Sequence, residues 1–145
     1  MPGSLTYNSQ KLVLNYIFRN SPSELGFVFL GLIAEGTISY YDTLETIAER
    51  EIEVTDENYS CQFINFSKPH AKENNNICMV KNNNEFQFGP WEEEQIDEIT
   101  EAFICTAHTG TNGILLAQLD LTHPRKPSAG KVLDVLLGDL IFEIE

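Results

Sequence analysis

The chain of 145 residues has the length of a single domain, and its 42% hydrophobic and 21% charged residues are typical of a soluble globular protein. Its net charge of −13 argues against a phosphate-neutralising surface for DNA or RNA, because only nine Lys and Arg residues are spread along the sequence. The acidity also disfavours docking on an anionic membrane, and no apolar run approaches the roughly 18 residues that span a bilayer.

The first strong element is an amphipathic helix over residues 10–19, capped by Asn8 or Ser9. Its broad apolar face is formed by Leu12, Val13, Tyr16 and Ile17. Residues 1–7 show no periodic pattern, which predicts a flexible arm that becomes ordered on a partner surface. The start of the chain lacks the basic residues and apolar core of a signal peptide, so we expect a protein that is used without secretion.

After Pro22, which ends this helix, residues 25–34 are almost all apolar and predict a short strand buried on both faces. A loop over residues 36–42 carries Tyr40 and Tyr41, which either form a recognition tip or pack against the body; the pattern favours packing. Residues 43–50 predict a short helical turn. Residues 51–55 alternate like a strand with one exposed face.

Short strands are also expected between residues 59 and 88. Residues 59–67 place apolar side chains on both sides, which indicates a change of face or a β-bulge. Residues 76–80 and 86–88 predict two shorter strands. Asn triplets beside the first of these suit turns, because Asn tolerates left-handed backbone.

Two apolar runs, residues 99–107 and 114–121, flank a turn rich in Gly, Thr and Asn. This composition predicts a β-hairpin around which the rest of the chain is organised. The odd positions of the first run form one apolar face, which Glu101 interrupts.

A helix competes for the first arm of this hairpin, because Pro90 and the acidic residues 92–94 favour a helix start. We expect a helical turn over residues 91–95 followed by a strand, since β-branched and aromatic residues are frequent from Ile99 onward. Residues 122–130 then predict an extended loop that concentrates Arg125 and Lys126 near Lys131. This loop is either solvated or a contact for an acidic partner. Residues 131–137 and 140–145 close the chain as strands.

These elements predict one mainly β domain over residues 8–145, preceded by the arm over residues 1–7. We expect a β-sandwich or barrel-like domain of about seven to nine short strands with one N-terminal amphipathic helix. No internal repeat is visible in the sequence.

No nucleophile elbow, phosphate loop, dinucleotide fingerprint or zinc-protease motif occurs, so we expect a protein that is not an enzyme. Cys61, Cys78 and Cys105 form no CxxC pair and predict buried free thiols in a reducing compartment. The acidic residues between 92 and 101 predict a solvated face, because their spacing fits neither a calcium loop nor a catalytic carboxylate pair. We therefore expect no metal and no cofactor.

The order of the helical, strand and loop segments along the chain forms a recognisable pattern. The helical segment 10–18 precedes a strand like residues 25–32, and Phe88-Gly-Pro-Trp precedes the hairpin. A Pro-rich loop then leads to Ser128-Ala129-Gly130 and a closing segment over residues 138–144. This order resembles a group of small virion proteins of tailed bacteriophages. The resemblance implies a β-rich structural protein of the particle, without catalytic residues to transfer.

The chain departs from that pattern in the middle, where Ala48-Glu-Arg-Glu stands in place of a Gly-Tyr-Ala-Arg-like segment. The first functional hypothesis is a capsid decoration (cement) protein, which binds the outer surface of the phage head and stabilises contacts between capsomers. Such a protein would partner the major capsid protein as a homo-oligomer, with a trimer favoured, and would be assembled into the virion in the bacterial cytoplasm. Its acidic surface fits, because an outer-shell protein needs solubility and has no reason to bind DNA.

Two alternatives remain open. A tail, neck or baseplate structural protein would partner tail proteins of the same virion. A soluble carbohydrate- or peptide-binding β-sandwich module would use the loops of Tyr40, Tyr41 and Trp91. The candidate interface residues are Leu5, Tyr7, Tyr40, Tyr41, Trp91, Arg125 and Lys126.

Overall fold

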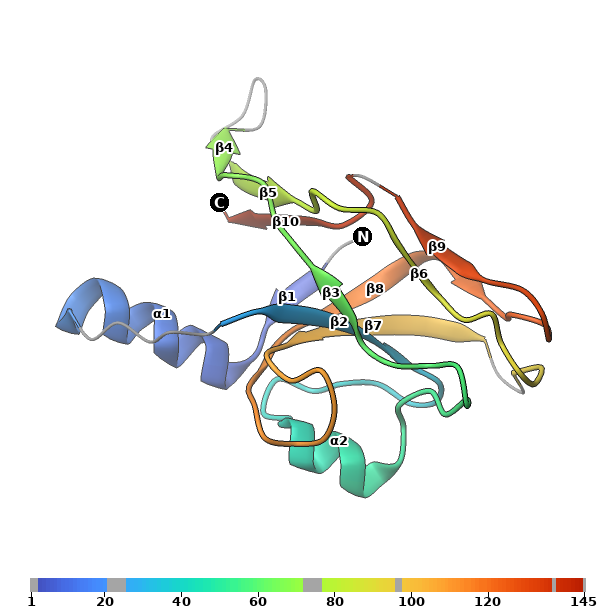
Figure 1. Ribbon diagram of the computed structural model, residues 1–145. Coiled ribbons are helices and arrows are strands. Elements are labelled where there is room, and N and C mark those ends of the chain that lie inside the picture. Colours follow the sequence, from blue (N-terminus) through green and yellow to red (C-terminus); the bar gives the residue numbers. More distant parts are fainter. Residues whose placement is uncertain (1–2, 21–25, 72–76, 96–97, 137, 145) are drawn as a thin grey trace.

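A five-stranded antiparallel sheet is the centre of the computed structural model, which describes residues 3–20, 26–71, 77–95, 98–136 and 138–144 (Figure 1). In spatial order its strands are β1 (Gly3–Leu5), β8 (Leu115–Arg125), β7 (Ile99–Cys105), β2 (Val28–Ile33) and β3 (Gln62–Ile64). Strands β7 and β8 form the expected hairpin, with Ile104 opposite Ala117. The hairpin prediction is therefore confirmed.

Two smaller sheets and two helices complete the fold. One sheet contains β10 (Ile141–Ile144), β5 (Cys78–Lys81) and β4 (His70–Ala71), and the other pairs β6 (Phe86–Phe88) with β9 (Leu133–Val135). The helices are α1 (Tyr7–Arg19) and α2 (Leu44–Arg50). The mainly β class and the N-terminal helix are confirmed, with ten strands and two helices among the described residues.

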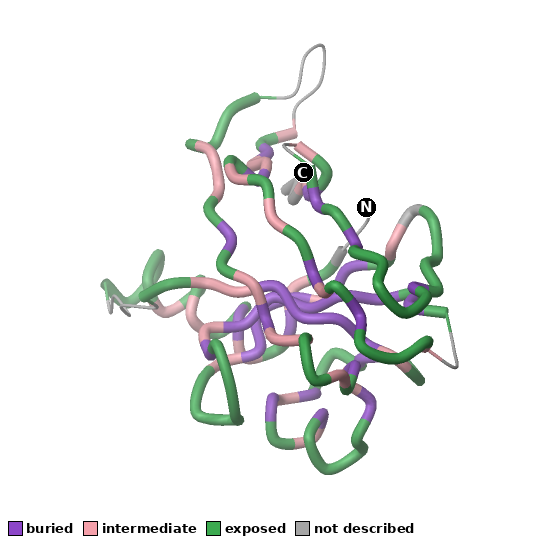
Figure 2. The backbone as a smooth tube through the Cα atoms, turned by 45° about the vertical axis from the view of Figure 1, so that its right-hand side comes forward, coloured by how far each residue is buried: buried purple, intermediate pink, exposed green. Residues whose placement is uncertain are grey.

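The central sheet is buried on both faces, which separates the core into two clusters of side chains. On one face Leu30 and Leu32 pack with Phe88 of β6 and with Leu133 and Val135 of β9. On the other face Ile33 and Phe103 pack with Leu44 and Ile47 of α2. Figure 2 shows the buried positions concentrated in the middle of the molecule, where the central strands run. The prediction of a strand buried on both faces is confirmed for β2 from Leu30 onward.

Gly31 is the position where β2 and β7 lie closest. The ring of Phe103, which is opposite Gly31 in the register, occupies the space that a Cβ atom would need: an ideal Cβ would lie 2.2 Å from the ring. A side chain at this position would therefore overpack the core.

Several expectations for the N-terminal half are corrected by the structure. Gly3–Leu5 is paired with β8 as an edge strand, so from Gly3 onward the expected arm over residues 1–7 is part of the fold. The helix begins at Tyr7, because the hydroxyl of Thr6 caps it by accepting a hydrogen bond from Ser9 N. Residues 51–55 form one isolated bridge, Glu53 with Ile33, instead of a strand. Residues 21–25, where the end of the helix was assigned to Pro22, lie outside the described residues.

The second half carries two further corrections. Residues 91–95 contain a bend at Glu92 and Glu93 instead of a helical turn, because the carboxylate of Asp56 binds the backbone N–H groups of these two residues from another part of the chain. Strand β8 extends to Arg125 through the segment predicted as a loop, with Arg125 opposite Ile99. Pro124 is tolerated there because β1 covers β8 only at residues 117–119, so one edge of β8 lacks a β1 partner.

Candidate functional site

Three tyrosines from two segments form an aromatic cluster at one end of the central sheet, and we call Tyr7, Tyr40 and Tyr41 the Tyr cluster. The ring centroids lie 5.9 Å apart for Tyr7 and Tyr40, 5.4 Å for Tyr7 and Tyr41, and 4.9 Å for Tyr40 and Tyr41. Tyr41 remains 72% exposed. The rings therefore pack on one another, and Tyr41 still reaches the surface.

Backbone and side-chain hydrogen bonds connect the start of α1 to this cluster. Tyr7 N donates to Tyr40 O at 3.0 Å, and Tyr40 Oη donates to Gln10 Oε1 at 2.5 Å. The buried hydroxyl of Thr6 donates to Leu115 O on β8, also at 2.5 Å. The first turn of α1 is therefore anchored both to the central sheet and to the loop that carries Tyr40.

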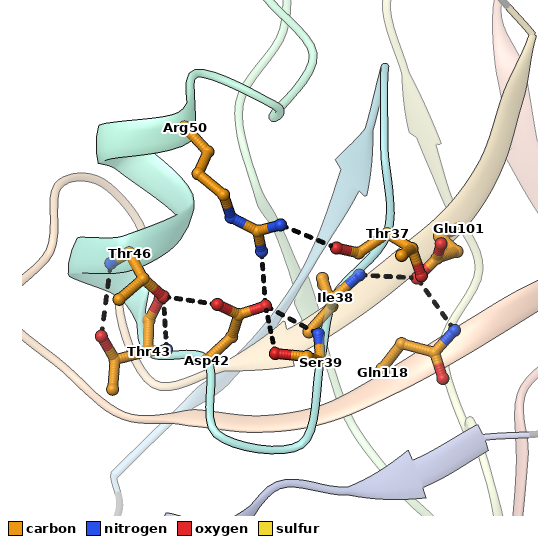
Figure 3. A network of polar contacts seen from close by, with 9 residues as sticks. All are labelled: Thr37, Ile38, Ser39, Asp42, Thr43, Thr46, Arg50, Glu101 and Gln118. Carbon is orange, nitrogen blue, oxygen red and sulfur yellow. Dashed lines mark hydrogen bonds and ion pairs between the residues drawn. The ribbon is translucent and has the colours of Figure 1, made fainter.

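Asp42 holds that loop in place (Figure 3). One carboxylate oxygen accepts hydrogen bonds from Ser39 N at 2.7 Å and from the guanidinium of Arg50, while the other accepts from Thr46 Oγ1 at 2.8 Å. Arg50 also donates to Thr37 O. Helix α2, which supplies Thr46 and Arg50, is thus bonded to both sides of the loop.

The pKa of Asp42 reflects this environment. Burial by itself raises the pKa, but the hydrogen bonds from Ser39 N and Thr46 and the charge of Arg50 together lower it below the ordinary value of 3.8. Asp42 is therefore ionised at neutral pH and binds its partners as a carboxylate.

Glu101, the polar residue that interrupts the apolar face of the hairpin, lies beneath the same loop. It is buried, and its Oε1 accepts hydrogen bonds from Ile38 N at 3.1 Å and from Gln118 Nε2 at 3.0 Å (Figure 3). Sequence periodicity marked this residue as an exception but did not indicate what it bonds, and the expectation of a solvated acidic face is wrong for Glu101. The structure shows that it connects β7 and β8 to the loop that carries Tyr40 and Tyr41.

Beyond its first turns α1 exposes an apolar surface. Phe18 is 78% exposed, and Tyr16 and Ile17 are each 62% exposed. Val13 and Leu14 are exposed as well. We call these five residues the α1 face. The helix was predicted with an apolar face at Leu12, Val13, Tyr16 and Ile17, but only Leu12 packs against the core, and sequence reasoning missed Leu14 and Phe18.

Figure 1 shows the helix leading away from the central sheet. This explains the exposure, because the later turns of α1 extend past the edge of the sheet. The signal for Leu14 and Phe18 was their spacing of four residues, which repeats that of Val13 and Ile17 and places the pairs side by side on a helix.

The other predicted contact residues lie elsewhere. Leu5 is half-buried on β1. Arg125 and Lys126 are exposed and line a recess of about 490 Å³ with Lys131 and two carboxylates, Asp134 and Asp139. Since Ile99 pairs with Arg125 and Cys105 pairs with Leu115, this recess lies at the opposite end of the β7–β8 hairpin from the Tyr cluster.

Trp91 corrects the expectation of an exposed contact. Its ring is 1% exposed and stacks on Tyr59 with centroids 6.3 Å apart, inside the cluster that contains Phe88. The side chain therefore stabilises the core and offers no surface to a partner.

A second recess, of about 300 Å³, lies between α2 and the loop that follows β7. Tyr59 Oη donates to Glu53 Oε1 at 2.7 Å in its wall, and burial raises the pKa of Tyr59 well above 10. A hydrogen bond to Cys105, together with burial, raises the pKa of the Cys61 thiol, so this sulfur is protonated at neutral pH. The prediction of buried free thiols is confirmed for Cys61 and Cys105 and is wrong for Cys78, which is free but exposed.

The described residues contain no group of three or more His, Cys, Asp or Glu side chains that could hold a metal ion. In the same part of the chain, no helix has both the length and the apolar character needed to cross a membrane.

A comparison with protein families identifies the chain. The sequence model of the podophage GP4 fiber I protein gp80 matches residues 5–143. The chain belongs to this family. The match covers both helices and strands β2 to β9, together with the last residue of β1 and most of β10. No curated protein matches the chain.

Membership in the fiber I family makes the protein a component of a phage virion, and its partners are to be sought within the same particle. The resemblance to virion proteins of tailed bacteriophages is confirmed at this level.

Proposed function

We propose that the protein is a structural, non-catalytic component of the tail fibres of a podophage. The observation that carries the proposal is the match of the fiber I family over residues 5–143. It favours the tail-associated alternative over capsid decoration, which was the first hypothesis from sequence.

The geometry supports a role in assembly. The body is built around a sheet buried on both faces, while the Tyr cluster and the α1 face offer aromatic and apolar side chains at the surface. Such exposed patches mark sites of protein–protein contact. A structural protein that is held by its neighbours in the particle needs surfaces of this kind.

The test is to locate the protein in purified virions by gold-labelled antibodies and by density in single-particle images. We expect label and density at the tail, with a copy number that follows the symmetry of the tail. Label spread over the head, at a fixed ratio to the major capsid protein, would instead establish the decoration role and overturn the proposal.

A second measurement separates assembly from receptor binding. The isolated protein is tested on an array of bacterial surface glycans, beside a Tyr41→Ala variant. Two results together would favour the carbohydrate-binding alternative. The isolated protein would bind a glycan saturably and lose this binding in the Tyr41→Ala variant, and the labelling experiment would find no protein at the tail.

A further inference from the structure

The strongest unassigned feature of the molecule is the α1 face. Its five apolar side chains are Val13, Leu14, Tyr16, Ile17 and Phe18. Among the residues that the structure describes, α1 packs on the core through Leu12, in its earlier turns. An exposed apolar surface of this size on one element is a contact surface that lacks its partner.

The distribution of charge along the chain indicates which kind of surface would cover the α1 face. Residues 1–23 contain two charged side chains, Lys11 and Arg19, and both are basic and exposed. Residues 24–145 contain seven basic and 22 acidic residues. The helix is therefore a cationic, apolar element on an acidic body, and its complement is an acidic surface with an apolar floor.

The body of the same chain carries such a surface at α2. The recess of about 300 Å³ beside this helix has an apolar floor that includes Leu44, Ile47 and Ala107. Around it, residues 45–57 contain a single basic residue, Arg50, which is paired with Asp42. The six carboxylates of that segment are Glu45, Glu49, Glu51, Glu53, Asp56 and Glu57.

We propose that the α1 face of one molecule docks on the α2 recess of a second copy of the same chain. Own-chain docking is excluded by the direction of α1, which leads away from the central sheet (Figure 1). Pairing of two α1 helices is disfavoured, because it would bring Lys11 and Arg19 of both copies together and leave the acidic segment uncovered.

The contact is heterologous, since it joins two different surfaces of one chain. Contacts of this type close into rings or continue as filaments, depending on the rotation between neighbours. The inference rests on the surface of the chain and does not depend on where in the virion the protein lies.

The first experiment measures the mass of the full-length protein by sedimentation velocity over a range of concentrations. A reducing agent is present because Cys78 is exposed. We expect concentration-dependent self-association that weakens as salt is added, because part of the attraction is between exposed charges. A protein that stays monomeric at every concentration would overturn the proposal.

Two variants then remove the two halves of the contact. Ile17→Asp with Phe18→Asp places carboxylates on the α1 face, and Ala48→Arg places a bulky cation at the edge of the α2 recess, where Ala48 is exposed. Each is expected to raise the dissociation constant roughly tenfold or more. Phe27→Asp is the matched control, because Phe27 is an exposed aromatic residue on neither surface and should leave association unchanged.

Mixing the two variants is the decisive step. The helix variant retains an intact recess and the recess variant retains an intact helix. The mixture should therefore form one-to-one dimers at concentrations where each variant alone is monomeric. Helix-to-helix pairing could not restore association in this way.

Circular dichroism verifies that both variants are folded. If the mixture stays monomeric, or if the helix variant associates like the unchanged protein, the proposal is wrong. The protein could also be monomeric in every form while the helix variant fails to be incorporated into virions. That result would assign the α1 face to a different virion protein and would likewise overturn the proposal.

Discussion

The loop over residues 37–43 and the outer half of α1 both present aromatic side chains at the surface, but they are supported in opposite ways. The loop is bonded from α2 through Asp42 and Arg50 and from the sheet through Glu101. The outer half of α1 exposes Tyr16, Ile17 and Phe18 and packs only through its earlier turns. The loop's conformation is therefore determined by contacts within this chain, whereas the apolar side chains on the outer half of α1 remain exposed.

Among the substitutions proposed below, the largest loss of unfolding free energy is expected in the core. Phe88 is fully buried, and its ring stacks on Tyr59 with centroids 5.8 Å apart. Phe88→Ala should lower the free energy of unfolding by about 4 kcal/mol, because it leaves a cavity between β6 and the sheet. Urea denaturation followed by tryptophan fluorescence of Trp91 measures this. A loss below about 1 kcal/mol would show that the layer of β6 and β9 is only loosely packed on the sheet.

Gly31 tests the packing of the opposite face of the sheet. Gly31→Ala should destabilise the fold by about 2 kcal/mol, since the new methyl group meets the ring of Phe103. The second substitution Phe103→Leu in the same chain should restore part of the loss, as it makes space for the methyl group. If the double variant lost as much unfolding free energy as the sum of the two single variants, the contact between position 31 and the ring of Phe103 would be contradicted.

Asp42 tests the anchoring of the loop. Asp42→Asn should cost about 1 to 2 kcal/mol of unfolding free energy, because the charge-assisted bond from Arg50 and one of the accepting oxygens are lost. Hydrogen exchange of Ser39 N, whose N–H binds this carboxylate, should speed up at the same time. The matched control is Asp134→Asn, at an exposed carboxylate in the recess at the other end of the hairpin, which should leave the exchange of Ser39 unchanged.

Protonation of Asp42 at low pH should reproduce part of the stability loss expected for Asp42→Asn. The folded-state pKa of Asp42 lies below 3.8, so its contribution to stability is present above the unfolded-state pKa and is lost as the pH falls through the folded-state value. We therefore expect the stability difference between the unchanged protein and Asp42→Asn to be constant above about pH 5 and to shrink below about pH 4. A difference that persists unchanged at lower pH would show that the carboxylate does not stabilise the loop as an ion.

The smallest effect is expected on α1. Phe18→Ala should change the unfolding free energy of the monomer by less than about 0.5 kcal/mol, because the ring is 78% exposed and contributes little to the core. Phe18→Ala and Phe88→Ala are the same substitution in an exposed and a buried environment, so each serves as the control for the other. If the two losses were similar under conditions where the protein is monomeric, α1 would be packed against its own body.

Much of the fold could be predicted from local patterns. The β7–β8 hairpin follows from two apolar runs around a turn, and the helical turn before Arg50 is α2, which Thr43 and Thr46 cap reciprocally. The Tyr cluster was partly predictable, since Tyr7, Tyr40 and Tyr41 were all named as contacts. Their meeting depends on the hydrogen bond from Tyr7 N to Tyr40 O, which joins segments that are distant in sequence.

Other features could not be predicted because they depend on contacts over long sequence separations. Trp91 follows a Gly-Pro turn and precedes three acidic residues, which indicates an exposed loop, yet its ring fills the core beside Tyr59 and Phe88. Residues 91–95 were expected to begin a helix, but Asp56 binds the N–H groups that the helix start would have left free. Gly3–Leu5 had no periodic pattern of its own and became ordered by pairing with β8.

The sequence by itself determined the mainly β class, the central hairpin, the N-terminal helix and the separation of a cationic first segment from an acidic remainder. Periodicity and composition are local properties, and they decide which residues share a face. Only the tertiary structure decided what covers each face. It placed Glu101 beneath the loop of Tyr40 and Tyr41, buried Trp91, and left the α1 face exposed, because the helix extends beyond the sheet on which its first turns are anchored.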